Sequence, residues 1–264
     1  MRKGYLNVPW GQVHFRTAES APDLPALILL HQSPLSSETY EPLLPLLAPW
    51  CRPFALDTPG YGESSPAPEG WEVADYAAAV WTCASLLGAE KAMLFGRATG
   101  AVFALEAARA HPERTLGLML YGFPAYTAEE RAHRIKHHAP PNPPKADGSH
   151  LQVLWNRIKG EYPWMAPELV MLSIRGYVAA GEDFASSYRS IWRHQDQPGK
   201  PPVPMLLIGG TKDRLNFMFE RGVKLFPGAE TAVLEGATDF VMYQEPARLA
   251  AVMRKMGTDP NILK

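Results

Sequence analysis

The chain has 264 residues, with 26 Lys and Arg against 27 Asp and Glu, so its formal net charge is −1. This balance gives no electrostatic reason to expect nucleic acid or an anionic membrane as a partner, and a small, near-neutral ligand fits better. The basic start of the chain lacks the apolar stretch of a signal peptide, and no later apolar run is long enough to span a bilayer. We therefore expect a cytoplasmic protein.

Neither cysteines nor histidines form a pattern typical of a metal site. Cys51 and Cys83 are isolated in the sequence, which favours two buried free thiols over a disulfide framework or a zinc site. His133 and His137 are four residues apart, a spacing that can bind a metal, but no acidic or cysteine ligand lies nearby. There is also no phosphate loop or dinucleotide fingerprint. We expect no metal and no cofactor.

Strands and helices alternate along most of the chain. Residues 4–9 and 11–17 alternate in polarity as two strands of a hairpin. After them we expect, in chain order, a strand at 26–31, a helix at 37–50, a strand at 51–57, a helix at 73–88, a strand at 91–95, a helix at 100–112, strands at 116–122 and 204–210, a helix at 217–228, a strand at 231–236 and a helix at 246–257. This order predicts an α/β fold with a mostly parallel sheet covered by helices on both faces. In such sheets, ligands bind beyond the carboxyl ends of the strands.

One segment breaks the alternation. Two proline clusters, "APPNPP" and "QPGKPPVP", bracket a stretch rich in Trp, Tyr, Arg and His that has helical spacing and no strand pattern. We interpret residues 124–203 as a helical cap inserted into a core formed by residues 1–123 and 204–264. An insertion at this end of the sheet would lie over the pocket as a lid.

Five motifs stand in the order that one known family has. They read "LLHQSPLSSETYEPLLPLLA", "ALDTPGYGESSP", "LFGRATGA", "LLIGGTKD" and "LEGATDF". Through them the chain resembles the α/β-hydrolase superfamily over essentially its whole length. The resemblance is closest to the capped branch, which includes carbon–carbon hydrolases, epoxide hydrolases, dehalogenases and small-ester hydrolases.

The resemblance implies a catalytic triad in which two of the three positions are altered. Ala98 stands at the position of the nucleophile, and Asp239 stands where the catalytic histidine is expected. Asp213 matches the acid that orients the family's histidine. Gly96 and Gly100, which let the nucleophile turn bend sharply, are kept.

The resemblance also implies an oxyanion hole. His31 and Gln32 match the turn after the third strand, so Gln32 would supply one backbone N–H and Thr99 the second. An alanine methyl cannot form a covalent intermediate, which excludes mechanisms that depend on attack by residue 98. Chemistry that needs only polarisation and proton transfer is left.

The two aspartates lead to two alternative expectations. If Asp213 and Asp239 face each other, both cannot ionise cheaply, so one should hold a proton near neutral pH and serve as a general acid or base. Alternatively, Arg97 or Arg214 pairs with one of them in an ordinary salt-bridge network. Arg97 itself could bind a substrate carboxylate or be a structural residue.

The cap supplies candidates for substrate contact. Its aromatic residues, among them Trp164 and Tyr177, suit a lid over an apolar ligand and equally suit the small core that a cap needs. His194 is the cap histidine that we expect to reach down toward the pocket. Exposed cap helices could also mediate a homodimer.

These observations favour a cofactor-independent enzyme without a covalent nucleophile, acting on a small, partly apolar organic molecule as a lyase, decarboxylase, cyclase or water-attack hydrolase. Two alternatives stay open. One is an ester or carbon–carbon hydrolase inactivated by replacement of a serine at Ala98, and the other is a ligand receptor without catalysis.

Overall fold

A mostly parallel sheet forms the centre of the protein. The computed structural model describes residues 1–138, 140–182 and 184–257, and within them the sheet has eight strands in the order β1-β2-β4-β3-β5-β6-β7-β8. The strands are β1 (Arg2–Val8), β2 (Gly11–Thr17), β3 (Ala26–Leu30), β4 (Arg52–Leu56), β5 (Ala92–Arg97), β6 (Thr115–Tyr121), β7 (Met205–Gly210) and β8 (Glu230–Leu234). β1 pairs antiparallel with β2, and β2 with β4, whereas all pairs from β4 to β8 are parallel. The predicted α/β fold class is confirmed.

Helices cover both faces of the sheet because successive residues of a buried strand point to opposite sides. In β3, Ile28 and Leu30 belong to one core cluster and Leu27 and Leu29 to the other. The first cluster includes residues of α2 (Val73–Leu86), α3 (Thr99–Ala110) and α8 (Phe219–Leu225), and the second includes residues of α1 (Leu44–Leu47), α9 (Val241–Gln244) and α10 (Pro246–Gly257). Every residue of β3 is buried, as expected of a strand covered on both faces.

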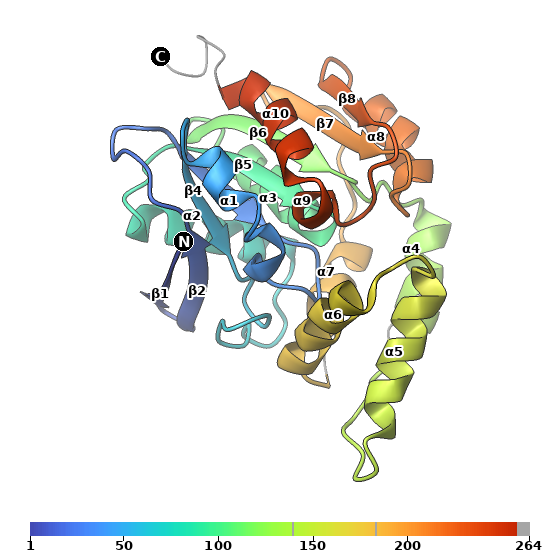
Figure 1. Ribbon diagram of the computed structural model, residues 1–264. Helices are drawn as coiled ribbons and strands as arrows, with labels where there is room; N and C mark the ends of the chain where they lie inside the picture. Colours follow the sequence, from blue (N-terminus) through green and yellow to red (C-terminus); the bar gives the residue numbers. More distant parts are fainter. Residues whose placement is uncertain (139, 183, 258–264) are drawn as a thin grey trace.

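The segment between β6 and β7 is helical. Its described residues form α4 (Ala128–His137), α5 (Ser149–Glu161), α6 (Pro167–Ala180) and α7 (Ser186–Arg193), all within the predicted cap at 124–203. Figure 1 shows these helices together on one side of the sheet, with α5 reaching farthest from it. α7 contacts α2 and α3 of the core. The insertion therefore covers the end of the sheet where the loops after the parallel strands lie.

The helix expected over 37–50 is the main departure from the prediction. The structure has a 3-10 helix at Ser37–Tyr40 and the single turn α1 at Leu44–Leu47. Pro42 and Pro45 explain the break, because a proline inside a helix lacks an N–H donor and clashes with the preceding turn. A second 3-10 helix, Asn216–Met218, precedes α8. Among the described residues, no helix combines the length and apolar character that crossing a membrane requires.

Candidate active site

The turn from β5 into α3 has the geometry of a nucleophile elbow with an alanine at its tip. Ala98 has φ 48° and ψ −110°, and it is the one non-glycine residue with positive φ in the described part of the chain. An L residue in such a conformation costs about 1–3 kcal/mol, which the surrounding packing must offset. At Gly100, a Cβ atom would lie 2.3 Å from the Leu30 carbonyl oxygen, so β3 and α3 approach too closely for any side chain there.

Two backbone N–H groups beside Ala98 are available to a ligand. Gln32 and Thr99 both line the same cavity as Ala98, and within the described residues neither N–H has a hydrogen-bond acceptor. The two loops that carry them are held together, because the Ser33 N–H donates to Thr99 Oγ1 over 2.7 Å and Thr99 Oγ1 donates to Ser33 Oγ over 3.1 Å. The two residues expected to supply the oxyanion N–H groups therefore lie on adjoining loops at the cavity.

The cap is tied to this floor by a chain of buried hydroxyl groups. Ser187 Oγ donates to Ser33 Oγ over 2.6 Å, and Tyr188 Oη donates to the Ser33 carbonyl oxygen. Tyr61 Oη lies 2.6 Å from Ser187 Oγ and donates to the Phe184 carbonyl oxygen over 3.0 Å. The core loop that carries Tyr61, the loop that carries Ser33 and the start of α7 in the cap thus share one hydrogen-bond network.

Arg97 contacts both aspartates that the resemblance assigns to triad positions. Its Nη2 donates hydrogen bonds to Asp239 Oδ1 over 3.1 Å and to Asp213 Oδ1 over 3.2 Å, and it lies 3.0 Å from Asp213 Oδ2. All three side chains are buried. Burial disfavours the charged guanidinium, but the two carboxylates outweigh it and raise the pKa of Arg97. Gly122 makes room for this arrangement, since a Cβ atom there would lie 2.4 Å from Arg97 Nη1.

This cluster has features of both arrangements expected for the aspartates, the carboxyl with a raised pKa and the salt-bridge network. Burial raises the pKa of Asp213 to about 6, with Arg97 opposing the shift and Asp239 adding to it. A salt-bridge network and a carboxyl with a raised pKa are therefore both present. Both carboxylates contact Nη2 of Arg97, and the guanidinium neutralises part of their mutual repulsion.

Asp239 has a partner for each of its oxygen atoms. Tyr162 Oη donates to Oδ1 over 3.1 Å, in addition to Arg97, and the backbone N–H of Arg214 donates to Oδ2 over 3.0 Å. The Arg214 side chain donates to Tyr162 Oη over 3.2 Å and pairs with Glu161. Burial first, and Asp239 second, raise the pKa of Tyr162, so its hydroxyl stays protonated.

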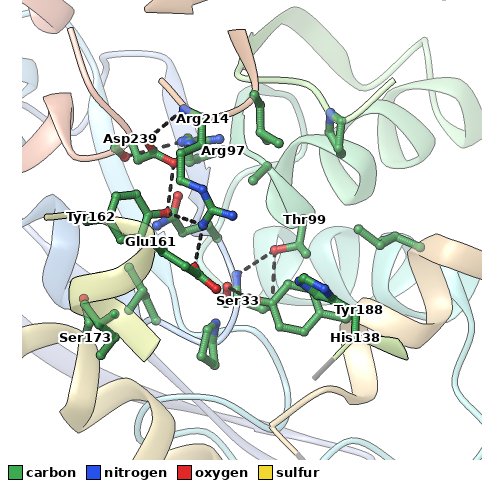
Figure 2. A pocket seen from close by; sticks show the side chains of 18 of the residues that line it. Ser33, Arg97, Thr99, His138, Glu161, Tyr162, Ser173, Tyr188, Arg214 and Asp239 are labelled. Carbon is green, nitrogen blue, oxygen red and sulfur yellow. Dashed lines mark hydrogen bonds and ion pairs between the residues drawn. The ribbon is translucent and has the colours of Figure 1, made fainter. Parts of the chain in front are cut away.

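These groups surround a cavity of about 120 Å³ between the core and the cap. Figure 2 shows Arg97, Asp239, Tyr162 and Arg214 grouped in one part of its wall and Ser33, Thr99 and Tyr188 in another. The further lining residues that matter below are Tyr126, Arg134, His138, Arg157, Glu161 and Tyr177. The floor comes from the ends of β3 and β5 and the upper wall from the cap helices. Ligands bind at this end of open α/β sheets.

A protein-family model described as the alpha/beta hydrolase family matches residues 27–252. The chain belongs to this family. No curated protein sequence matches it significantly.

Solved structures of several hydrolases of similar fold agree with this assignment. The structure of an enol-lactonase from Burkholderia xenovorans LB400 is 19% identical, with a TM-score of 0.73, over 97% of this chain and 100% of that one. Epoxide hydrolase A from Mycobacterium thermoresistibile is 18% identical, with a TM-score of 0.76, over 97% of each chain. A hydrolase from Pseudomonas aeruginosa PA01 is 20% identical, with a TM-score of 0.75, over 97% of this chain and 98% of that one. At these identities the similarity establishes the shared fold alone.

Four residues expected at the site of this α/β hydrolase lie outside the cavity wall. His31 is fully buried, where its Nε2 accepts the Thr58 N–H over 3.0 Å and its Nδ1 lies 3.0 Å from the Gln32 carbonyl oxygen, so it braces the loop. Trp164 is half exposed, and His194 points to Glu106 and Asp196 instead of to the pocket. Asp213 lies behind Arg97. These placements correct the expected substrate contacts of His31, Trp164 and His194.

Other expected residues do line the cavity, and the cap adds several that the sequence did not single out. Gln32, Arg97, Ala98, Thr99, Tyr177 and Asp239 are part of the wall. His138, which the sequence did not single out, is in the wall, whereas His194 is not. Arg134, Arg157 and Glu161 join it from α4 and α5. Their helical spacing predicted a cap, but not which helix faces meet over the elbow.

Proposed function

We propose that this chain is a cofactor-independent enzyme that acts on a small, partly apolar organic molecule without forming a covalent intermediate. The observation that carries the proposal is the floor of the cavity, where Ala98 lies beside the free N–H groups of Gln32 and Thr99. Decarboxylation, elimination, retro-aldol cleavage, cyclisation and direct attack by water all develop negative charge on an oxygen atom. Each preorganised donor at such an oxygen contributes a factor of order 10²–10³ in rate.

Proton transfer falls to Asp239 in this proposal. Asp239 lines the cavity with its partner Tyr162, and the raised pKa of Tyr162 keeps a proton within 3.1 Å of the carboxylate. Asp213 does not line this cavity, so it acts as a positioning residue that fixes Arg97. The sequence left both aspartates as candidates for proton transfer. We assign that role to Asp239, because it is the one that lines the cavity.

A receptor without catalysis is the second candidate, and one specific observation favours it. Both oxygen atoms of Asp239 already accept hydrogen bonds, from Arg97, Tyr162 and the Arg214 N–H. A substrate group that uses these oxygen atoms must compete with the donors already bound to them. If no substrate displaces these partners, the pocket binds its ligand and leaves it unchanged.

The experiment that separates the two is incubation of the purified protein with metabolite extracts, followed by untargeted mass spectrometry. We expect one compound to disappear with the parent protein and to survive with Asp239→Asn. Arg175→Gln, a change outside the cavity on the exposed side of α6, should convert it like the parent. His138→Gln is run in parallel to show whether conversion also depends on the cap histidine. A compound that is retained on the parent protein but never converted would establish the receptor instead.

A further inference from the structure

The wall of the cavity carries more positive than negative charge. Besides one histidine and four tyrosines, its ionisable lining residues are four arginines and two carboxylates: Arg97, Arg134, Arg157, Arg214, Glu161 and Asp239. Asp213, behind Arg97, adds a carboxyl whose pKa is raised to about 6 by burial. The net charge of the whole chain is −1, so this excess of cations is local. A small enclosed site with such an excess attracts an anion.

The excess of positive charge is on the cap side of the cavity, because the core arginines already have carboxylate partners. Arg97 lies between two aspartates, and Arg214 pairs with Glu161. Arg157 shares the same Glu161 at 3.4 Å. Arg134 has no carboxylate within ion-pair distance in the described part of the chain. Within the described residues, Glu161 thus pairs with Arg157 and Arg214, and Arg134 is left without an ion pair.

The pKa of His138 also depends on the positive charge of this wall. Burial, as the largest cause, and the neighbouring charges of Arg134, Arg157 and Arg214 together lower its pKa to about 4, against the opposing effect of Glu161. Arg134 Nη1 lies 3.4 Å from His138 Nε2, and its guanidinium stacks over the Tyr126 ring at 4.5 Å. His138 is therefore neutral at pH 7, although it lies where an imidazolium would suit an anion. The group is half buried and open to the cavity.

We propose that the cap wall, defined as Arg134, His138 and Arg157, binds the charged group of an anionic substrate, a carboxylate or a phosphate. Guanidinium groups bind both through paired N–H donors, and partial burial strengthens the contact. The inference rests on the proposed function, since it places the reacting oxygen of the same molecule at the Gln32 and Thr99 N–H groups. The substrate is then a small organic anion with a short, partly apolar body, which fits a cavity of about 120 Å³.

The test compares three probes of one shape by isothermal titration calorimetry: benzoate, phenylphosphonate and uncharged benzamide. We expect saturable binding of an anion and binding of benzamide that is weaker by about tenfold or more. The anion that binds more tightly identifies the charged group as a carboxylate or a phosphate. Arg134→Gln and Arg157→Gln should each weaken anion binding by about tenfold, whereas Arg175→Gln should stay within about twofold of the parent.

A second readout follows the imidazole of His138 by NMR. The groups that face it are Arg134 on α4, Arg157 and Glu161 on α5, Arg214 after β7, and the Trp192 ring on α7. A bound anion should raise the pKa of His138, because a neighbouring negative charge stabilises the imidazolium. Unchanged thermal unfolding midpoints show that each variant is folded. Arg134→Lys keeps the charge without the planar guanidinium and should fall between the parent and Arg134→Gln.

Three results would overturn the inference: neither anion binds, benzamide binds as tightly as the anions, or both glutamine variants bind like the parent. The readouts do not require turnover. Anion binding without any conversion of metabolites would therefore leave this site standing and refute the proposed catalysis. Conversion of a neutral metabolite without anion binding would support the proposed catalysis and refute the anion site.

Discussion

At the scale of single residues, the elbow is held by contacts that exclude larger side chains. We expect Gly100→Ala to lower the free energy of unfolding by about 3 kcal/mol or more, because its Cβ would overlap the Leu30 and His31 carbonyl oxygens at 2.3 and 2.7 Å. Gly160→Ala is the matched control, since this exposed position in α5 has no atom within 4 Å of the added methyl. It should raise the free energy of unfolding by about 0.5–1 kcal/mol. Urea titrations measure both, and equal effects would contradict the packing described for the elbow.

A serine at residue 98 should not restore a hydrolase. We expect Ala98→Ser to release p-nitrophenol from p-nitrophenyl acetate no faster than the parent, because Arg97 and Asp239 occupy the place of a catalytic histidine. The measurement is intact-protein mass spectrometry of the reaction mixture beside the absorbance trace. An acetylated protein together with a burst of p-nitrophenol would show that the chain is an inactivated hydrolase instead.

At the scale of elements, the Arg97 cluster links the ends of β5, β7 and β8 and makes their stability depend on pH. The pKa of Asp213, raised mainly by burial, is about 6 in the folded protein against an ordinary value of 3.8. Between these pH values the folded protein binds more protons than the unfolded chain, so stability falls as the pH rises through this window. In Asp213→Asn the free energy of unfolding should fall by about 2 to 3 kcal/mol less over this window than in the parent, because the variant lacks the titrating carboxyl.

The check is the difference between the unfolding free energies of the parent and Asp213→Asn, measured from pH 3.8 to about 6. Asp239→Asn is informative as a second variant, because Asp239 raises the pKa of Asp213 and its removal should lower that pKa. Parallel curves for the parent and Asp213→Asn would mean that the carboxyl does not titrate in this window.

The elements themselves were largely predictable, and the exceptions have local causes. The run Ala26–Leu30 predicted a strand buried on both faces because nothing polar interrupts it. The helix expected over 37–50 failed where Pro42 and Pro45 remove backbone donors. The elbow was recognisable from Gly96 and Gly100 because its geometry depends on nearby residues. The pairing of Arg97 with two aspartates was left open, since it joins loops more than 100 residues apart.

At the scale of the whole molecule, the cap and the core are joined through buried hydroxyl groups. Tyr61→Phe removes the hydroxyl that contacts the Phe184 carbonyl and Ser187, and we expect it to lower the free energy of unfolding by about 1–3 kcal/mol. Hydrogen exchange in α7 should become faster, because this helix then has fewer contacts with the core. Tyr5→Phe, at a hydroxyl bound to exposed Glu63, is the control and should change stability by less than about 0.5 kcal/mol. If exchange in α7 is unchanged in Tyr61→Phe, the hydroxyl chain does not hold the cap.

The charge and composition of the cap wall could not be predicted from the sequence. A net charge of −1 suggested a near-neutral ligand, whereas Arg134 and Arg157 bring two positive charges to the cavity wall beside the neutral His138. Helical spacing gives the period of each cap helix but not the angle at which the helices cross the core. His138 lies in the wall and His194 does not because of that packing, which depends on contacts distant in sequence.

The central claim is turnover without a covalent intermediate at Ala98. The measurement that tests it most directly records, in one sample, the moles of metabolite converted per mole of protein and the intact mass of the protein. We expect conversion of many equivalents while the protein mass stays that of the unmodified chain. Retention of at most one equivalent without conversion, or a protein mass increased by part of the metabolite during turnover, would contradict it.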